Sequence, residues 1–181
     1  MASSDSLFDN PWSRPVETHD FRHGKELDDT PSSDDDDEAS TVDAAERQAA
    51  GNQLFKDGDL EGACEAYASA LSSLVGVPEP DLSAMSAVLC NRSAALVKLG
   101  RSEDAVQDAT DAIKFDRRQA KPHYRLATAL KSLGRHREVV DACDEGLELA
   151  PEHEQLEALR TSAFAQMRCM ADFGRGMGIG Q

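Results

Sequence analysis

Aromatic and basic residues are scarce in this sequence. Its 181 residues include six Phe, two Tyr and one Trp, and 19 Lys and Arg stand against 34 Asp and Glu, so the formal net charge is −15. Nucleic acids and anionic membranes are bound mainly by surplus Lys and Arg. No segment approaches the roughly 20 apolar residues that span a bilayer. We therefore expect the main partner to be neither a nucleic acid nor a membrane.

The residue patterns that indicate metal sites and active sites are also absent. The four cysteines form no CxxC pair, and none has a histidine at zinc-ligand spacing. The five histidines show no arrangement with Ser, Cys or carboxylate partners that indicates acid–base or nucleophilic chemistry. We expect no metal, no cofactor and no enzymatic activity. The first ten residues lack the positive and apolar regions of a secretory signal, which favours a cytoplasmic protein.

Residues 1–42 are predicted to be a disordered acidic tail. The segment is rich in Ser, Asp and Pro and has no sustained apolar period, so it buries too little surface to fold. Ser32 and Ser33 each have an acidic residue three positions on, a pattern of acid-directed phosphorylation sites that is also frequent by chance. The apolar residues of the tail are either a linear motif for a second protein or isolated side chains; they are Leu7, Phe8 and Trp12.

An internal repeat begins at about residue 43. The last two of three aligned glycines are 34 residues apart, and the first interval is eight residues longer because it includes a connection with two prolines. Each copy predicts a helix, a tight turn and a second helix, and we expect Asp59 and Ser102 to cap second helices. The aligned columns are Gly58, Gly100 and Gly134; Gly51, Ser93 and Ala127; Leu54, Leu96 and Leu130; Ala63, Ala105 and Val139; Tyr67, Ala109 and Cys143; and Ala70, Ala112 and Gly146.

This pattern resembles the tetratricopeptide repeat family. The resemblance implies an all-α, right-handed helical-repeat solenoid of three helix pairs, at about residues 43–76, 84–117 and 118–151. A further helix at 152–172 is expected to cap the stack, and residues 173–181 are predicted to be flexible. The apolar face of the helix at 152–172 is formed by Leu156, Leu159, Ala163, Met167 and Met170. A lipid or partner site at Met167 and Met170 is the alternative for the end of that face.

Polar residues recur at helical spacing on the first helix of each predicted pair. Spacings of three, four or seven residues place side chains on one face of a helix. Lys and Arg donate charge-assisted hydrogen bonds and the amides donate neutral ones, which suits a ligand with two carboxylates. Residues 92–137 also carry a net charge of +6, whereas residues 1–43 carry −10. The candidate binding residues are Gln48, Asn52, Asn91, Lys98, Lys121 and Arg125.

This set is similar to the two-carboxylate clamp of tetratricopeptide co-chaperones, such as the Hsp-organising and small glutamine-rich proteins. The resemblance implies binding of the terminal Glu-Glu-Val-Asp of the seventy- and ninety-kilodalton heat-shock proteins. It places Asn52, Asn91, Lys121 and Arg125 on four of the five clamp positions and Lys98 on a supporting one. The fifth position, normally Lys, is Gln48. Loss of that charge is expected to weaken binding about tenfold.

Two alternatives remain open from the sequence. The six polar residues are either a clamp or ordinary solvated side chains of a repeat. The chain is accordingly either a co-chaperone or adaptor, or a scaffold that binds another peptide or helix without needing a free carboxylate. Arg47 could replace the missing charge beside Gln48, but one residue along a helix turns a side chain by about 100°.

Overall fold

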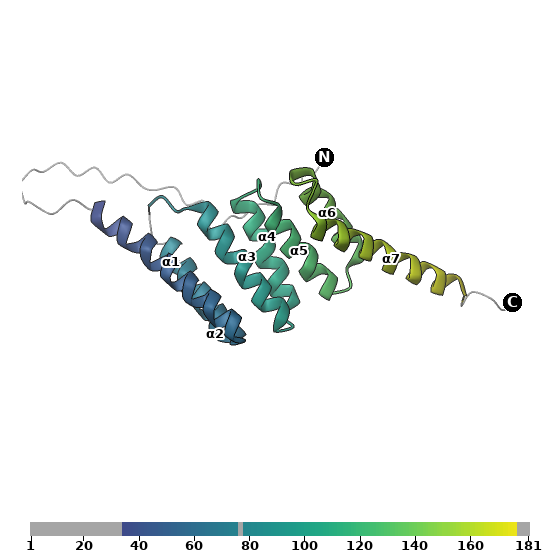
Figure 1. Cartoon of the computed structure of the whole chain (residues 1–181), viewed down its shortest axis with the longest axis horizontal. Coiled ribbons are helices and arrows are strands. Elements are labelled where there is room, and N and C mark those ends of the chain that lie inside the picture. The colour runs from purple at the N-terminus through teal and green to yellow at the C-terminus, as the bar shows by residue number, and fades with distance from the viewer. Residues whose placement is uncertain (1–33, 76–77, 177–181) are drawn as a thin grey trace, which may run out of the picture. The chain divides into compact units, whose positions relative to one another are not determined.

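The computed structural model describes residues 34–75 and 78–176, with side chains described for residues 43–75 and 78–170. This part of the chain contains seven helices and no strand, which confirms the predicted all-α fold. Successive helices pack against one another as three pairs followed by a last helix (Figure 1). The helices are α1 (Asp34–Asp57), α2 (Leu60–Val75), α3 (Leu82–Lys98), α4 (Ser102–Phe115), α5 (Ala120–Ser132), α6 (His136–Leu149) and α7 (Glu154–Gly176).

The N-terminal boundary differs from the sequence prediction. Helix α1 begins at Asp34, inside the predicted tail of residues 1–42. The acidic run 34–38 therefore starts a helix, and acidic residues are favoured there because the N-terminal end of a helix carries a partial positive charge. The predicted linear motif and phosphorylation sites lie outside the described residues: Leu7, Phe8, Trp12, Ser32 and Ser33.

The three aligned glycines form the turns between the helices of each pair. Gly58, Gly100 and Gly134 have φ angles of 89°, 78° and 72°, in the left-handed region that favours glycine. After α3, the N–H groups of Gly100 and Arg101 donate to the carbonyls of Val97 and Leu96, at 3.1 and 2.9 Å. These are the two hydrogen bonds of a Schellman motif, which ends a helix sharply.

One of the two predicted helix caps is correct. The Asp59 carboxylate accepts a hydrogen bond from the backbone N–H of Gly62 at 2.9 Å, as an N-cap does. Ser102 is instead the first residue of α4, and the N-cap is Arg101, which makes no side-chain cap bond. The prediction was wrong by one position, because the residue that follows the turn glycine, as Asp59 does, is Arg101 rather than Ser102.

Small residues allow the helices of a pair to approach closely. A Cβ atom on Gly51 of α1 would lie 2.7 Å from the Tyr67 ring of α2, so only glycine fits there. Ser93 of α3 is fully buried, and its hydroxyl donates to the carbonyl oxygen of Ala105 in α4 at 2.9 Å. Close packing within each pair therefore fixes the position of the first helices, which carry the candidate binding residues.

Helix α7 packs on α6 and α5. Leu156 and Ala163 are buried in a cluster with Val139 and Cys143, as expected for a helix that covers the end of the stack. The end of α7 extends beyond the other helices (Figure 1). The same apolar face becomes exposed there, and Met170 is 60% exposed. None of the described helices is long and apolar enough to cross a membrane.

Candidate functional site

Three of the candidate binding residues are joined by hydrogen bonds. Asn52 lies on α1, Asn91 on α3 and Lys121 on α5. The Asn91 Nδ2 donates to Asn52 Oδ1 at 3.2 Å, and the Lys121 Nζ donates to Asn91 Oδ1 at 3.2 Å. The stacking of the three helix pairs thus brings together side chains that are 39 and 30 residues apart in the sequence.

Tyr67 extends this network from the second helix of the first pair. Its hydroxyl donates to Asn52 Oδ1 at 2.8 Å, and its side chain is only 1% exposed. Burial raises the pKa of Tyr67, while the positive charge of Arg125 opposes the rise. Tyr67 was not among the binding residues predicted from the sequence. The only signal in the sequence was that Tyr67 is the one aromatic residue in its repeat column.

Arg125 lies one turn after Lys121 on α5 and is half-buried. Its Nε is buried and has no hydrogen-bond partner among the described residues. Burial raises the pKa of the Cys90 thiol to about 11, and the charges of Lys121 and Arg125 act against that rise. Lys121 and Arg125 therefore both lie close to α3. Arg125 retains hydrogen-bonding capacity that no described residue uses.

The remaining two candidates are less closely integrated. The Lys98 Nζ lies 4.0 Å from the centre of the Phe55 ring, a cation–π contact that joins α3 to α1. Gln48 is half-buried one turn before Asn52, and none of the described residues forms a hydrogen bond with its side chain. We call Asn52, Asn91, Lys121 and Arg125 the amide–cation cluster.

Arg47 does not replace the charge that Gln48 lacks. Its guanidinium binds Asp43, with Nε 2.9 Å from Oδ1, and its Nη1 donates to the Ser69 hydroxyl of α2 at 2.6 Å. The side chain is therefore held against α2. The positive charges among the candidate binding residues are therefore those of Lys98, Lys121 and Arg125.

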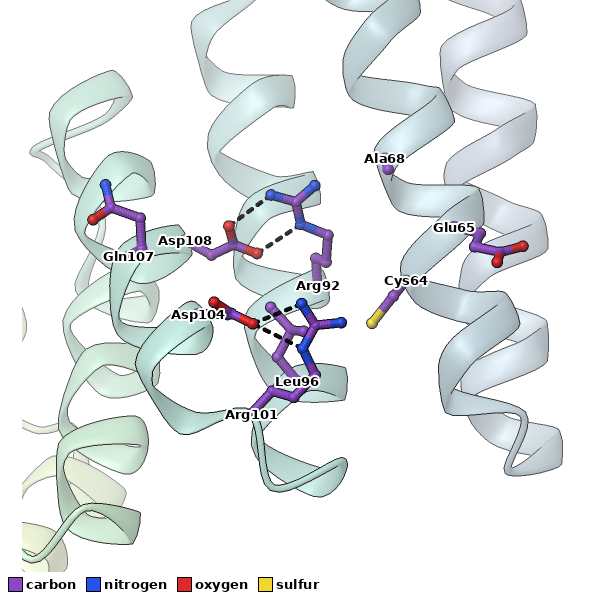
Figure 2. A pocket seen from close by; sticks show the side chains of 9 residues that line it. All are labelled: Cys64, Glu65, Ala68, Arg92, Leu96, Arg101, Asp104, Gln107 and Asp108. Carbon is purple, nitrogen blue, oxygen red and sulfur yellow. Dashed lines mark hydrogen bonds and ion pairs between the residues drawn. The ribbon is translucent and has the colours of Figure 1, made fainter.

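A cavity of about 390 Å³ lies between α2, α3 and α4, and no residue of the amide–cation cluster lines it (Figure 2). Arg92 donates to both carboxylate oxygens of Asp108, at 2.7 and 2.6 Å, and Arg101 donates to Asp104 at 2.7 Å. Both cations that line this cavity are thus already paired with carboxylates. It offers an acidic ligand no unpaired positive charge, in contrast to the amide–cation cluster.

Comparison with known proteins identifies the repeat. A tetratricopeptide repeat family model matches residues 120–153, which include α5 and α6. The chain is 34% identical over 114 residues to small glutamine-rich tetratricopeptide repeat-containing protein 2 of Mycosarcoma maydis, covering 63% of this chain and 30% of that protein. It is 32% identical over 124 residues to the STIP1 homolog of Dictyostelium discoideum, covering 67% and 20%. The chain thus spans less than a third of the length of these relatives.

A solved structure gives the same result for the fold. The second TPR domain of human RPAP3, determined in complex with the HSP70 peptide SGPTIEEVD, is 26% identical to this chain with a TM-score of 0.59. The match covers 70% of this chain and 97% of that domain. The matched repeat, the curated relatives and the shared fold together show that this chain is a tetratricopeptide repeat protein.

Proposed function

We propose that the amide–cation cluster binds the acidic C-terminal end of a chaperone through a two-carboxylate clamp. The ligand is of the Glu-Glu-Val-Asp type, as in the seventy- and ninety-kilodalton heat-shock proteins, and the chain is a co-chaperone or adaptor without enzymatic activity. The observation that carries the proposal is the hydrogen-bonded set of Asn52, Asn91 and Lys121, with Arg125 beside it.

The chemistry of the cluster supports a ligand with carboxylates. An ionised carboxylate only accepts hydrogen bonds, and the cluster supplies donors from two amides, an ammonium and a guanidinium. Bonds to the charged donors contribute about 1.5–3 kcal/mol each and those to neutral donors about 1 kcal/mol. Lys121 and Arg125 therefore provide most of the affinity. With Gln48 in the place of a lysine, we expect binding about tenfold weaker than with a complete clamp.

The comparisons favour the same ligand. The human RPAP3 domain, which matches this chain over most of its own length, was determined with a peptide that ends in Glu-Glu-Val-Asp. The proposal places the protein in the cytoplasm. The predicted motif of Leu7, Phe8 and Trp12 would bind a second protein there and connect it to the chaperone.

A titration with two peptides tests the proposal. A fluorescent peptide ending in Glu-Glu-Val-Asp and its C-terminally amidated twin are titrated with the full chain, and binding is followed by fluorescence anisotropy. We expect amidation to weaken binding about tenfold or more, because it removes one of the two carboxylates. Arg125→Ala should weaken binding of the free acid by a similar factor. Lys131→Ala is the matched control, since Lys131 is an exposed cation in the last turn of the same helix.

The alternative is a scaffold whose binding surface takes a different peptide or helix and needs no free carboxylate. The observation in its favour is the neutral Gln48, which leaves α1 without a cation in the candidate site. Equal affinity for the two peptides would support the scaffold over the clamp. Absence of binding to either peptide would contradict the clamp.

A further inference from the structure

The hydrogen-bond network around Asn52 has a fixed polarity, which is the order of donors and acceptors along it. The residues at its two ends, Lys121 and Tyr67, determine that order. The Lys121 ammonium has only N–H donors, so the atom of Asn91 that faces it must be Oδ1. The Asn91 amide then turns its Nδ2 toward Asn52, and the Asn52 atom that accepts from it must be Oδ1. The Tyr67 hydroxyl contacts that same Oδ1 and must donate to it.

This polarity leaves mainly donors for a ligand. The carbonyl oxygens of both amides accept hydrogen bonds from within the network. The Asn52 Nδ2 has no partner among the described residues, and the Lys121 ammonium has further N–H groups. A carboxylate is complementary to such a surface because it only accepts. An amide oxygen turned toward the ligand would instead repel its carboxylate.

The packing around Tyr67 fixes where its hydroxyl lies. The ring is buried in the interface of α1 and α2. A Cβ atom on Gly51 would lie only 2.7 Å from Cε1 of Tyr67, so the ring fills the space beside this glycine. The hydroxyl donates to Asn52 Oδ1 at 2.8 Å, which places it beside the amide–cation cluster. Because the buried hydroxyl has a fixed position, its hydrogen bond fixes the orientation of the Asn52 amide.

We propose that Tyr67 is a positioning residue for ligand binding. Its hydroxyl holds Asn52 Oδ1 inward, so that the Asn52 Nδ2 is presented to a carboxylate of the ligand. The inference rests on the proposed function, because the ligand is the same acidic chain end. Without the hydroxyl, Asn52 Oδ1 retains only the longer bond from Asn91, and the amide is free to rotate its oxygen toward the ligand.

Tyr67→Phe tests the role with the smallest possible change, since it removes one oxygen and keeps the ring. We expect affinity of the full chain for the peptide ending in Glu-Glu-Val-Asp to fall about fivefold, the effect of one neutral hydrogen bond. Tyr124→Phe is the matched control. Tyr124 is the other tyrosine of the chain, and its hydroxyl makes no hydrogen bond to the described residues. Unchanged affinity of Tyr67→Phe would overturn the proposal.

A double-mutant cycle separates positioning from a general effect on packing. Asn52→Ala removes the amide through which Tyr67 is proposed to act. In that background, Tyr67→Phe should have no further effect on affinity, because no amide remains to be oriented. A loss that is the same in both backgrounds would show a purely structural role and overturn the proposal.

A measurement without peptide keeps the inference separate from the proposed function. In ¹⁵N–¹H spectra, Tyr67→Phe should shift the side-chain amide signals of Asn52 and Asn91, whereas Tyr124→Phe should leave them in place. If the wild-type chain bound neither peptide, the proposed function would fail, and these spectra would still decide whether Tyr67 orients Asn52. Unshifted amide signals in Tyr67→Phe would overturn the positioning role.

Discussion

Two arginines in the wall of one cavity show how burial determines the contribution of an ion pair to stability. Arg92 and Arg101 each bind an aspartate through two nitrogen atoms (Figure 2). The Asp108 side chain is 8% exposed and that of its partner Arg92 is 26% exposed, whereas Arg101 and Asp104 are 61% and 52% exposed. The bond to Asp108 raises the pKa of Arg92. The first pair joins α3 to α4, and the second lies within a single turn.

We expect Arg92→Met to lower the free energy of unfolding by about 2–3 kcal/mol, because it leaves the Asp108 carboxylate buried without a partner. Arg101→Met is the control of equal size change, and it should lower the free energy of unfolding by less than about 1 kcal/mol because that pair is solvated. Urea unfolding of both variants, followed by circular dichroism, measures the two values. Equal losses would contradict the difference that we assign to burial.

At the scale of single residues, the sequence predicts which helix face a side chain occupies but not what it bonds to. The four-residue spacing of Lys121 and Arg125 places both on one face of α5. The bond from the Tyr67 hydroxyl to Asn52, and the turn of Arg47 toward Ser69, depend on the distance between α1 and α2. The helical period of the sequence does not predict the distance between α1 and α2, because that distance is set by packing between the helices.

At the scale of elements, the turns are the features most closely determined by sequence. Each turn glycine has a positive φ, and a Cβ at Gly58, Gly100 or Gly134 would meet no atom within 4 Å. Glycine is therefore required there by the backbone and not by the surrounding atoms. The cap predicted at Ser102 was wrong by one position, because Ser102 is already the first residue of α4 and the N-cap residue is Arg101, which makes no side-chain cap bond.

We expect Gly134→Ala to lower the free energy of unfolding by about 1–2 kcal/mol, the cost of a left-handed conformation for a residue with a Cβ. Gly134→Asn should lower it less, because Asn adopts this conformation more readily. Chemical denaturation of both variants beside the wild type gives the comparison. Equal destabilisation by Ala and Asn, or no effect of Ala, would contradict a requirement for the left-handed backbone conformation at Gly134.

At the scale of the whole molecule, the net charge of −15 conceals a region of opposite sign. The segment 92–137 carries +6 and includes Lys98, Lys121 and Arg125. Helix stacking brings two of these cations beside the amides of α1 and α3, while other cations of the segment, such as Arg92 and Arg101, are paired with carboxylates. The uneven distribution was evident in the sequence. Which cations remain available to a ligand became evident only from the packing.

The most direct test of the amide–cation cluster as the binding site is its response to the peptide in ¹⁵N–¹H spectra. Unlabelled peptide ending in Glu-Glu-Val-Asp is added to the labelled full chain. The side-chain amide of Gln107, in the wall of the cavity between α2, α3 and α4, serves as the internal reference. If the amide–cation cluster is the binding site, the largest shifts occur at the side-chain amides of Asn52 and Asn91, and none occurs at Gln107. Shifts concentrated at Gln107, or no shift at either asparagine, would contradict this assignment.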